Sequence, residues 1–547
     1  MFRRKVDSWT SISIILAFLF AFFLVYPLIN LLREAIFVNG EFTLSAFETF
    51  FSRPYYTNSI LNSFKIAISV TIFSLLLGIP FSYFYTFYKI RGKKILFVLV
   101  LLSTMSAPFI GAYAWILLMG NSGLITQFLR NFGISGVTIY GFGGIVFVQT
   151  MKFFPLVVIY MNGAFRDIDN SLLEAAESMN CTGIQRFHEV IMKLTMPTIL
   201  AAALLVFMRS FADFGTPILI GRGYLTFPVL IYNSFLGENG ADFHFASAVS
   251  VIAVVVTAVI FVIQRVASNR FKFSISSLNP ITPKESKGLK GFLMNGYNFL
   301  LVALAMLPQL YIVNMSFRNY NNSILQPGYS LVNYTKAIEK NLFRAINNTL
   351  IISIVTLTII IIVGIFIAYL VVRRSNLLNN SIDMISMLPY IMPGGVIGIA
   401  LIISFSRQPI VLTGSLVIMI IALAIRRLPY ASRSATAAMM KIPESTEEAA
   451  LSLGASKMGS FFKITVPMMS SGILAGAVLS WVSIITEMSS GVILYNNRTI
   501  TLTLGTYVSI NNGTYGVAAV FATVTTVFTI ICLFLYLKIS KTEDVKI

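Results

Sequence analysis

Apolar runs of about 20 residues without a charged side chain recur along the whole chain of 547 residues. A helix of about 20 residues crosses the roughly 30 Å hydrocarbon layer of a bilayer. Charged residues make up 11% of the chain, against about 25% in soluble domains, which is too few to cover a water-facing surface. The sequence therefore predicts an all-α polytopic membrane protein in a lipid bilayer. It excludes a soluble enzyme, a disordered regulator and a secreted disulfide scaffold.

We expect twelve transmembrane helices from these runs. The first run follows Arg3, Arg4 and Lys5. It is too long for a signal-peptide core and has no small-residue cleavage site, so we expect it to be retained. The predicted spans are 9–32, 62–88, 95–119, 139–162, 194–213, 244–264, 292–316, 346–372, 381–405, 410–431, 466–487 and 514–537.

The distribution of basic residues predicts the orientation. If the N-terminus is cytoplasmic, most of the 40 Lys and Arg residues fall in the inner segments. Cytoplasmic loops of membrane proteins carry this excess of cations, so we expect both termini in the cytoplasm. The same rule explains the net charge of +19, and nucleic acid is not an expected partner.

A polar stretch at 265–290 divides the chain into two halves of six spans each. It contains Arg, Lys and Pro residues and is typical of a cytoplasmic linker. We expect a first repeat at 1–264 and a second at 291–547. Because each repeat holds an even number of spans, both enter the membrane in the same direction and are parallel repeats.

The two halves also match residue by residue at constant spacing. The matches in the first part of each half, where 62 corresponds to 348, are Asn62-Ser63 with Asn348-Thr349, Gly78 with Gly364, and Tyr83 with Tyr369. The later matches, where 155 corresponds to 429, are Pro155 with Pro429, Glu174-Ala175-Ala176 with Glu448-Ala449-Ala450, Phe187 with Phe461, and Asp213 with Glu487. One such match is weak, but a constant register over this length indicates an internal repeat.

Each half has one long cytoplasmic loop, at 166–193 and at 440–463. The second loop begins with Glu and Ala, which favour helix, and Gly454 then permits a sharp bend. Phe461 and Phe462 supply apolar anchors before the next span. We expect a helix, a bend and a second short helix beneath the membrane, resting on lipid or fitting a groove on a partner.

The second loop resembles the EAA loop of ABC importer permeases. The resemblance rests on Glu448-Ala449-Ala450, Gly454 after three further residues, and an apolar tail ending at Pro467. With its copy in the first loop, it covers both halves and nearly the full chain. It implies that each loop docks on one of two cytoplasmic ABC ATPase subunits. The implied coupling residues are Glu174, Ala175, Ala176, Asn180, Glu448, Ala449, Ala450 and Gly454.

The first loop departs from the pattern, because Asn180 stands where Gly is expected and Lys193 stands where Pro is expected. Asn tolerates left-handed backbone better than most residues, so a bend remains possible. Since Asn180 already has a side chain, we expect a β-branched residue to be tolerated better there than at Gly454.

Motifs for catalysis and metal binding are missing from the sequence. There is no Gly-x-x-x-x-Gly-Lys-Ser/Thr loop for ATP phosphates. His188 and His244 stand alone, and the two cysteines, Cys181 and Cys532, form no metal-ligand spacing. We therefore expect no enzyme activity, no metal and no cofactor in this chain, with ATP hydrolysis in a separate subunit.

Three ionisable residues are candidates for the pathway or an outer gate: Arg209, Asp213 and Glu487. Arg209 and Asp213 lie four residues apart and could pair across one helical turn. The alternatives are an outer gate or docking contact for a cargo-delivering protein, and ordinary interface charge. We expect the neighbouring cations Lys152, Arg426 and Arg427 to snorkel to the headgroups.

The segment from Ser210 to Gly221 resembles fused permeases of the ferric-iron import group. This resemblance implies a permease in the bacterial cytoplasmic membrane, with an extracytoplasmic substrate-binding protein as partner and ferric iron as cargo. Related permeases for thiamine, polyamines or phosphonates share much of the pattern. The rival is an ion-coupled secondary transporter, which places ionisable groups near mid-membrane.

Overall fold

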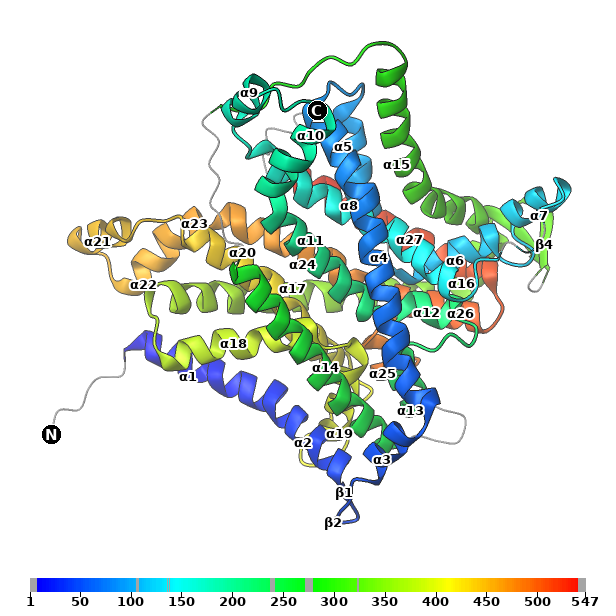
Figure 1. The fold of residues 1–547 in the computed structure, drawn as a ribbon. Helices are drawn as coiled ribbons and strands as arrows, with labels where there is room; N and C mark the ends of the chain where they lie inside the picture. The colour runs from blue at the N-terminus through cyan, green and yellow to red at the C-terminus, as the bar shows by residue number, and fades with distance from the viewer. Residues whose placement is uncertain are drawn as a thin grey trace. The chain divides into compact units, whose positions relative to one another are not determined.

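The computed structural model describes residues 7–104, 108–134, 136, 138–236, 242–270, 279–321 and 324–539. Most of these residues are helical (Figure 1). The strands are two short antiparallel hairpins, β1 (Phe37–Val38) with β2 (Glu41–Phe42), and β3 (Arg318–Asn321) with β4 (Ile324–Tyr329). The predicted all-α architecture is confirmed at this level.

The chain divides into two compact units. Unit 2 comprises Arg53–Leu230 and Val256–Met315. Its helices are α4 (Pro54–Phe87), α5 (Lys93–Thr104), α6 (Pro108–Met119), α7 (Leu124–Asn131), α8 (Phe142–Arg166), α9 (Asn170–Ser178), α10 (Gly183–Arg186), the π-helix η2 (Phe187–Met192), α11 (Lys193–Phe211) and α12 (Gly215–Ile220). Three helices have residues in both units: α13 (Phe227–Leu236), α14 (Phe243–Arg270) and α15 (Gly288–Phe317).

Unit 1 comprises Met1–Ser52, Ile231–Val255 and Ser316–Ile547. Its N-terminal helices are α1 (Ser8–Phe20), the π-helix η1 (Ala21–Val25), α2 (Tyr26–Ile36) and α3 (Ser45–Ser52). The later ones are α16 (Val332–Glu339), α17 (Leu342–Arg373), α18 (Leu377–Ile391), α19 (Gly394–Phe405), α20 (Leu416–Met439), α21 (Glu444–Ser452), α22 (Lys457–Ser460), the π-helix η3 (Phe461–Thr465), α23 (Val466–Met468), α24 (Ser470–Ile485), α25 (Gly491–Leu494), α26 (Leu502–Asn511) and α27 (Tyr515–Ile539).

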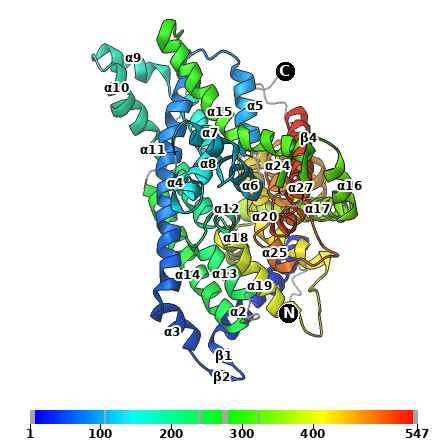
Figure 2. The same cartoon turned by 90° about the vertical axis from the view of Figure 1, so that its right-hand side faces the viewer.

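Three long helices form the centre of each unit. In unit 2, α4 packs against α8 and α11, and Figure 2 shows α4 as a long blue helix beside them. In unit 1, α17 packs against α20 and α24 in the same way. Glycine brings the first two helices of each set close together. A Cβ on Gly78 would lie 2.7 Å from Val157 Cβ of α8, and a Cβ on Gly364 would lie 3.2 Å from the Ser432 nitrogen of α20.

The first helix of each sequence half packs in the unit that holds the central helices of the other half. In unit 1, Trp9 of α1 stacks on Tyr369 of α17, with ring centroids 4.1 Å apart. In unit 2, the Tyr297 hydroxyl of α15 donates a hydrogen bond to the Leu77 carbonyl of α4 at 3.0 Å. The compact units and the sequence halves therefore differ in their first helices.

Nine helices among the described residues are long and apolar enough to cross a membrane. The number rises to eleven if two bent pairs each count as one span, namely Leu377–Tyr390 with Gly394–Phe405 and Lys457–Met468 with Gly472–Ile485. Both numbers are below the twelve predicted from apolar runs. The count of twelve, the repeat and the cytoplasmic termini stay predictions.

The predicted span at 410–431 is missing from both numbers, and those at 381–405 and 466–487 correspond to the two bent pairs. The predicted span at 95–119 is displaced, since the structure has a candidate span at Phe109–Asn131. The run at 95–119 falls on two shorter helices, α5 and α6, and residues 105–107 between them lie outside the described part of the chain. The run at 410–431 falls on α20, which begins only at Leu416 and carries Arg426, Arg427 and Arg433. Hydropathy summed over a run detects neither the break between α5 and α6 nor the arginines of α20.

Candidate functional site

The loop at 440–463 contains the helix and bend that the sequence predicts. Helix α21 ends at Ser452, and Gly454 has a left-handed backbone with φ of +87°. The Ala455 nitrogen donates to the Ala450 carbonyl at 3.0 Å, and the Gly454 nitrogen donates to the Leu451 carbonyl at 3.0 Å. These two bonds are those of a Schellman cap, which requires a left-handed residue after the helix. The four-residue spacing from Ala450 to Gly454 follows from this cap.

The first loop forms the same cap without glycine. Asn180, which follows α9, has φ of +60°. The Cys181 nitrogen donates to the Ala176 carbonyl at 2.9 Å, and the Asn180 nitrogen donates to the Glu177 carbonyl at 3.0 Å. Because Asn180 is itself left-handed, a β-branched residue would be strained at either position. The expected better tolerance at Asn180 therefore has no basis in the backbone.

The capped helices expose the same residues in both loops. Glu174, Ala175, Glu448 and Ala449 are exposed, whereas Ala176 and Ala450 are buried. An apolar side chain then precedes each left-handed residue. Met179 is 82% exposed and Leu453 is 91% exposed. Each loop thus presents a carboxylate and an apolar tip to its surroundings.

Aromatic contacts fasten each loop to the long helix of its unit. Phe187 of η2 packs edge-on against Tyr83 of α4, with centroids 5.0 Å apart, and Phe461 of η3 packs in the same way against Tyr369 of α17 at 4.9 Å. In the second loop, Glu447 also pairs with Arg373 of α17 at 3.2 Å. The loops are therefore held by the long helices rather than suspended from flexible chain.

A largely buried ion pair joins α8 to the segment after α11 in unit 2. The Lys152 ammonium of α8 is 3.9 Å from Asp213 Oδ1, and Gln149 Nε2 donates to Asp213 Oδ2 at 2.9 Å. Asp213 follows α11, which ends at Phe211, and is 8% exposed. Lys152 lies about 15 Å along α8 from its start at Phe142, near the middle of the helix.

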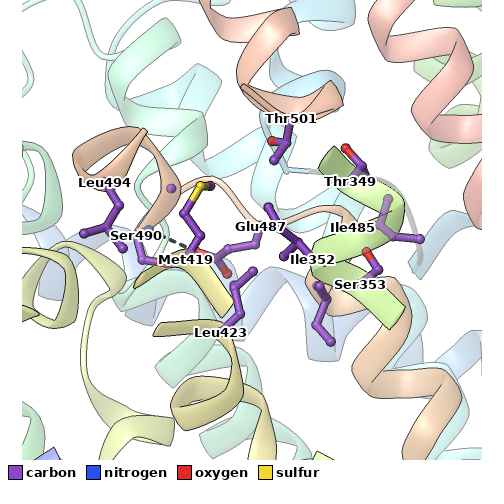
Figure 3. Close-up of a pocket in the computed structure, with 12 residues that line it drawn as sticks. Thr349, Ile352, Ser353, Met419, Leu423, Ile485, Glu487, Ser490, Leu494 and Thr501 are labelled. Carbon is purple, nitrogen blue, oxygen red and sulfur yellow. Dashed lines mark hydrogen bonds between the residues drawn. The ribbon is translucent and has the colours of Figure 1, made fainter. Parts of the chain in front are cut away.

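The equivalent position of unit 1 holds a larger charged cluster, with two arginines on one carboxylate. Arg426 and Arg427 of α20 both pair with the Glu487 carboxylate, which also accepts a hydrogen bond from the Ser490 nitrogen at 3.1 Å. An adjacent cavity of about 20 Å³ is lined by α17, α20, α24 and α25 and by Thr501. Figure 3 shows Glu487 among these residues, with its hydrogen bond to Ser490. The cavity has room for one water molecule.

These ion pairs correct two expectations. Lys152, Arg426 and Arg427 do not snorkel to headgroups, because each has a buried carboxylate partner within its own unit. Arg209 and Asp213 do not lie on one continuous helix, because α11 ends between them. The spacing from 152 to 426 equals that from 213 to 487, so the repeat register already held the signal for the pairs.

The matched Asn and hydroxyl residues hold the start of a short helix in each unit. In unit 2, Asn62 Nδ2 donates to the Leu225 carbonyl at 2.9 Å, and the Phe227 nitrogen of α13 donates to Ser63 Oγ at 2.8 Å.

In unit 1, Asn348 Nδ2 donates to the Ile500 carbonyl at 2.9 Å, and the Leu502 nitrogen of α26 donates to Thr349 Oγ1 at 3.0 Å. The bonds from the Phe227 and Leu502 nitrogens satisfy N–H groups that a helix start leaves free. The matches noted in the sequence are thus contact residues in the structure.

Comparison with known proteins gives one family match. Residues 360–541 match the family described as binding-protein-dependent transport system inner membrane component. The matched residues lie in the second half of the chain. They include the loop at 440–463 and the Arg426–Arg427–Glu487 cluster. With its many apolar helices, the protein is a multi-pass protein of the cytoplasmic membrane.

Three further proteins are similar to the chain. A putative ferric transport system permease protein of Haemophilus influenzae is 28% identical over 86% of this chain and 76% of its own length. A putative 2-aminoethylphosphonate transport system permease protein of Salmonella typhi is 27% identical over 45% of this chain and 86% of its own length. A solved bacterial ABC transporter involved in alginate import is 20% identical over 48% of this chain and 96% of that chain, with a TM-score of 0.40.

The first prediction concerns the ion pair of unit 2. Asp213→Lys should destabilise the protein by about 3–5 kcal/mol, because it leaves buried cations without a counter-charge. The exchange Lys152→Asp with Asp213→Lys should recover part of the loss. Thermal unfolding of the purified protein in detergent measures both. Lys89→Ala is the control, because Lys89 pairs with Glu285 at the surface and such pairs are worth about 0–1 kcal/mol. Equal melting temperatures for Asp213→Lys and the exchange variant would contradict the pairing.

The second prediction concerns the two caps. Gly454→Val and Asn180→Val should each strain the left-handed backbone by about 1–2 kcal/mol and impair transport. Gly454→Asn and Asn180→Gly should keep the cap and most activity. Transport assays on the four variants, at matched membrane levels, test this. Retained activity in either valine variant would show that the cap there is dispensable.

Proposed function

We propose that this chain is the membrane-spanning permease subunit of an ATP-driven ABC importer. An external binding protein delivers a small solute, and two cytoplasmic ABC ATPase subunits engage the loops at 166–193 and 440–463. The observation that carries the proposal is the pair of loops with one cap geometry and one exposure pattern. Two independent loops would not share the left-handed residue, the buried alanine and the exposed apolar tip by chance.

The loop tips have the chemistry of a docking surface. A side chain such as Met179 or Leu453 gains about 1.5–3 kcal/mol when it leaves water for an apolar pocket. The rigid cap holds this side chain in one position, so little conformational freedom is lost on binding. The exposed Glu174 and Glu448 add charge that fixes the orientation of a partner. A helix with these features fits a groove on an ATPase subunit.

Movement of a loop can reach the far end of its unit through the long helix. Tyr369 contacts Phe461 of the second loop, and Thr349 holds the first residue of α26. Both lie on α17 and are separated by about 30 Å along its axis. When ATP draws the two ATPase subunits together, the loops approach each other and each unit moves with its loop. The pathway then changes from inward-open to outward-open, and ATP hydrolysis resets it.

The ion-coupled transporter is the second candidate. Its coupling sites need carboxylates free to take up a proton or a metal ion within the membrane. Asp213 and Glu487 are carboxylates near the middle of the neighbouring helices, where a coupling site would lie. Each carboxylate is already paired with Lys or Arg, however. This pairing favours a structural brace over an ion site. ATP dependence of uptake separates the two candidates directly.

Ferric iron is the cargo we propose, with thiamine, polyamine or phosphonate as alternatives. The ferric proposal rests on the segment from Ser210 to Gly221 and on the similarity to a ferric transport permease over most of the chain. The phosphonate relative matches less than half of the chain. We propose that the external binding protein, rather than this chain, selects the cargo.

The third prediction tests docking. Leu453→Asp and Met179→Asp should each reduce co-purification of the ATPase at least tenfold, because a carboxylate would be buried without a partner. Leu377→Asp is the matched control. Leu377 is 86% exposed in the same unit as Leu453 but lies outside the loops. Normal recovery of ATPase with both loop variants would refute the docking assignment, and loss with Leu377→Asp would show a general folding defect.

The fourth prediction tests cargo. Cells that express the complete transporter should accumulate labelled ferric iron in an ATP-dependent manner. Parallel assays with labelled thiamine, putrescine and 2-aminoethylphosphonate serve as the alternatives. A Gly454→Val strain provides the background. Uptake of one of these three solutes without uptake of iron would overturn the ferric assignment and leave the importer role intact.

A further inference from the structure

Two tyrosines from opposite halves of the sequence meet through their hydroxyl groups. Tyr232 lies on α13 and Tyr507 lies on α26, and their oxygen atoms are 2.7 Å apart. Tyr507 is buried, with 6% of its surface exposed, and Tyr232 is partly buried. None of the contacts described above explains why this pair should exist.

The two helices that carry the tyrosines correspond to each other. Each is ten residues long, and each has a threonine, Thr226 or Thr501, directly before its first residue. Each start is fastened to its long helix by an Asn and a Ser or Thr. These contacts make Phe227 and Leu502 equivalent positions. The number of residues from 227 to 502 equals the number from 232 to 507. Tyr232 and Tyr507 are therefore equivalent positions of the two halves.

Contact between equivalent residues has a geometric meaning. In two repeats related by a twofold axis, equivalent atoms are separated by twice their distance from the axis. Equivalent hydroxyl oxygens 2.7 Å apart therefore lie within half that distance of the axis. In a permease built from parallel repeats, the pathway runs between the repeats, along the axis that relates them.

We propose that Tyr232 and Tyr507 form a gate that closes the translocation pathway on its axis. The proposal rests on the proposed function as an importer permease. The two hydroxyls exchange their mutual hydrogen bond for bonds to water when the rings separate. Helices α13 and α26 are only about 15 Å long, half the hydrocarbon thickness. They can shift with their long helices without displacing a full membrane span.

The test uses the complete transporter in liposomes that contain labelled erythritol, a small neutral probe. The double variant Tyr232→Ala, Tyr507→Ala should release erythritol without ATP at least tenfold faster than the wild type. The double variant to Phe keeps both rings and should leak less than twofold. Tyr297→Ala is the control, because Tyr297 also fills space between helices but lies far from residue 232 in sequence and packs within unit 2. It should not leak.

The outcomes separate the gate from the importer role. An alanine double variant that assembles with the ATPase but leaks no faster than the wild type would overturn the gate. Failure of the importer role would appear differently, as wild-type ATPase activity that the binding protein does not stimulate. If the alanine variant does not assemble, photo-oxidative cross-linking of the wild type decides. A Tyr232–Tyr507 cross-link should form in the resting complex and decline after trapping with ATP and vanadate, and an equal yield in both states would overturn the gate.

Discussion

The close packing of one long helix against its neighbour is the constraint on which each unit depends. At Gly364, α17 approaches α20 so closely that a Cβ would lie 3.2 Å from the Ser432 nitrogen. The same approach occurs at Gly78 between α4 and α8. The loop at 440–463 is attached at one end of α17 and the short helix α26 at the other. Since packed interiors transmit displacement rather than absorb it, the two ends of a long helix are mechanically linked.

The buried ion pairs complete this linkage. Lys152 and Arg426 lie on the helices that lead into the two loops, whereas Asp213 and Glu487 follow the helices that lead out of them. Each pair therefore joins the two helices on either side of a loop, far from the loop itself. Buried ion pairs add little net stability, because desolvation offsets the attraction, but a broken pair is costly. Such a pair favours one arrangement of the two helices and penalises others.

The sequence alone predicted a helical membrane protein and the helix and bend of the loop at 440–463, because these depend on local chemistry. A run of apolar residues, or an alanine four residues before a glycine, carries its meaning without distant partners. The partners of Lys152 and Glu487 could not be found locally, since about 60 residues separate the two members of each pair. The repeat register pairs 152 with 426 and 213 with 487, and so it contained the missing information. The number of spans could not be predicted in this way, because summed hydropathy does not identify charged or broken helices such as α20.

We expect the loop and the short helix of one unit to move as a single body. Spin-label distances in the complete transporter test this most directly, after Cys181 and Cys532 are replaced. One label pair at Leu453 and Asn512 lies within unit 1, and a second pair at Met179 and Leu453 joins the two loops. From the resting to the ATP-bound state, the first distance should stay constant and the second should shorten. A change in the first distance as large as that in the second would contradict the account.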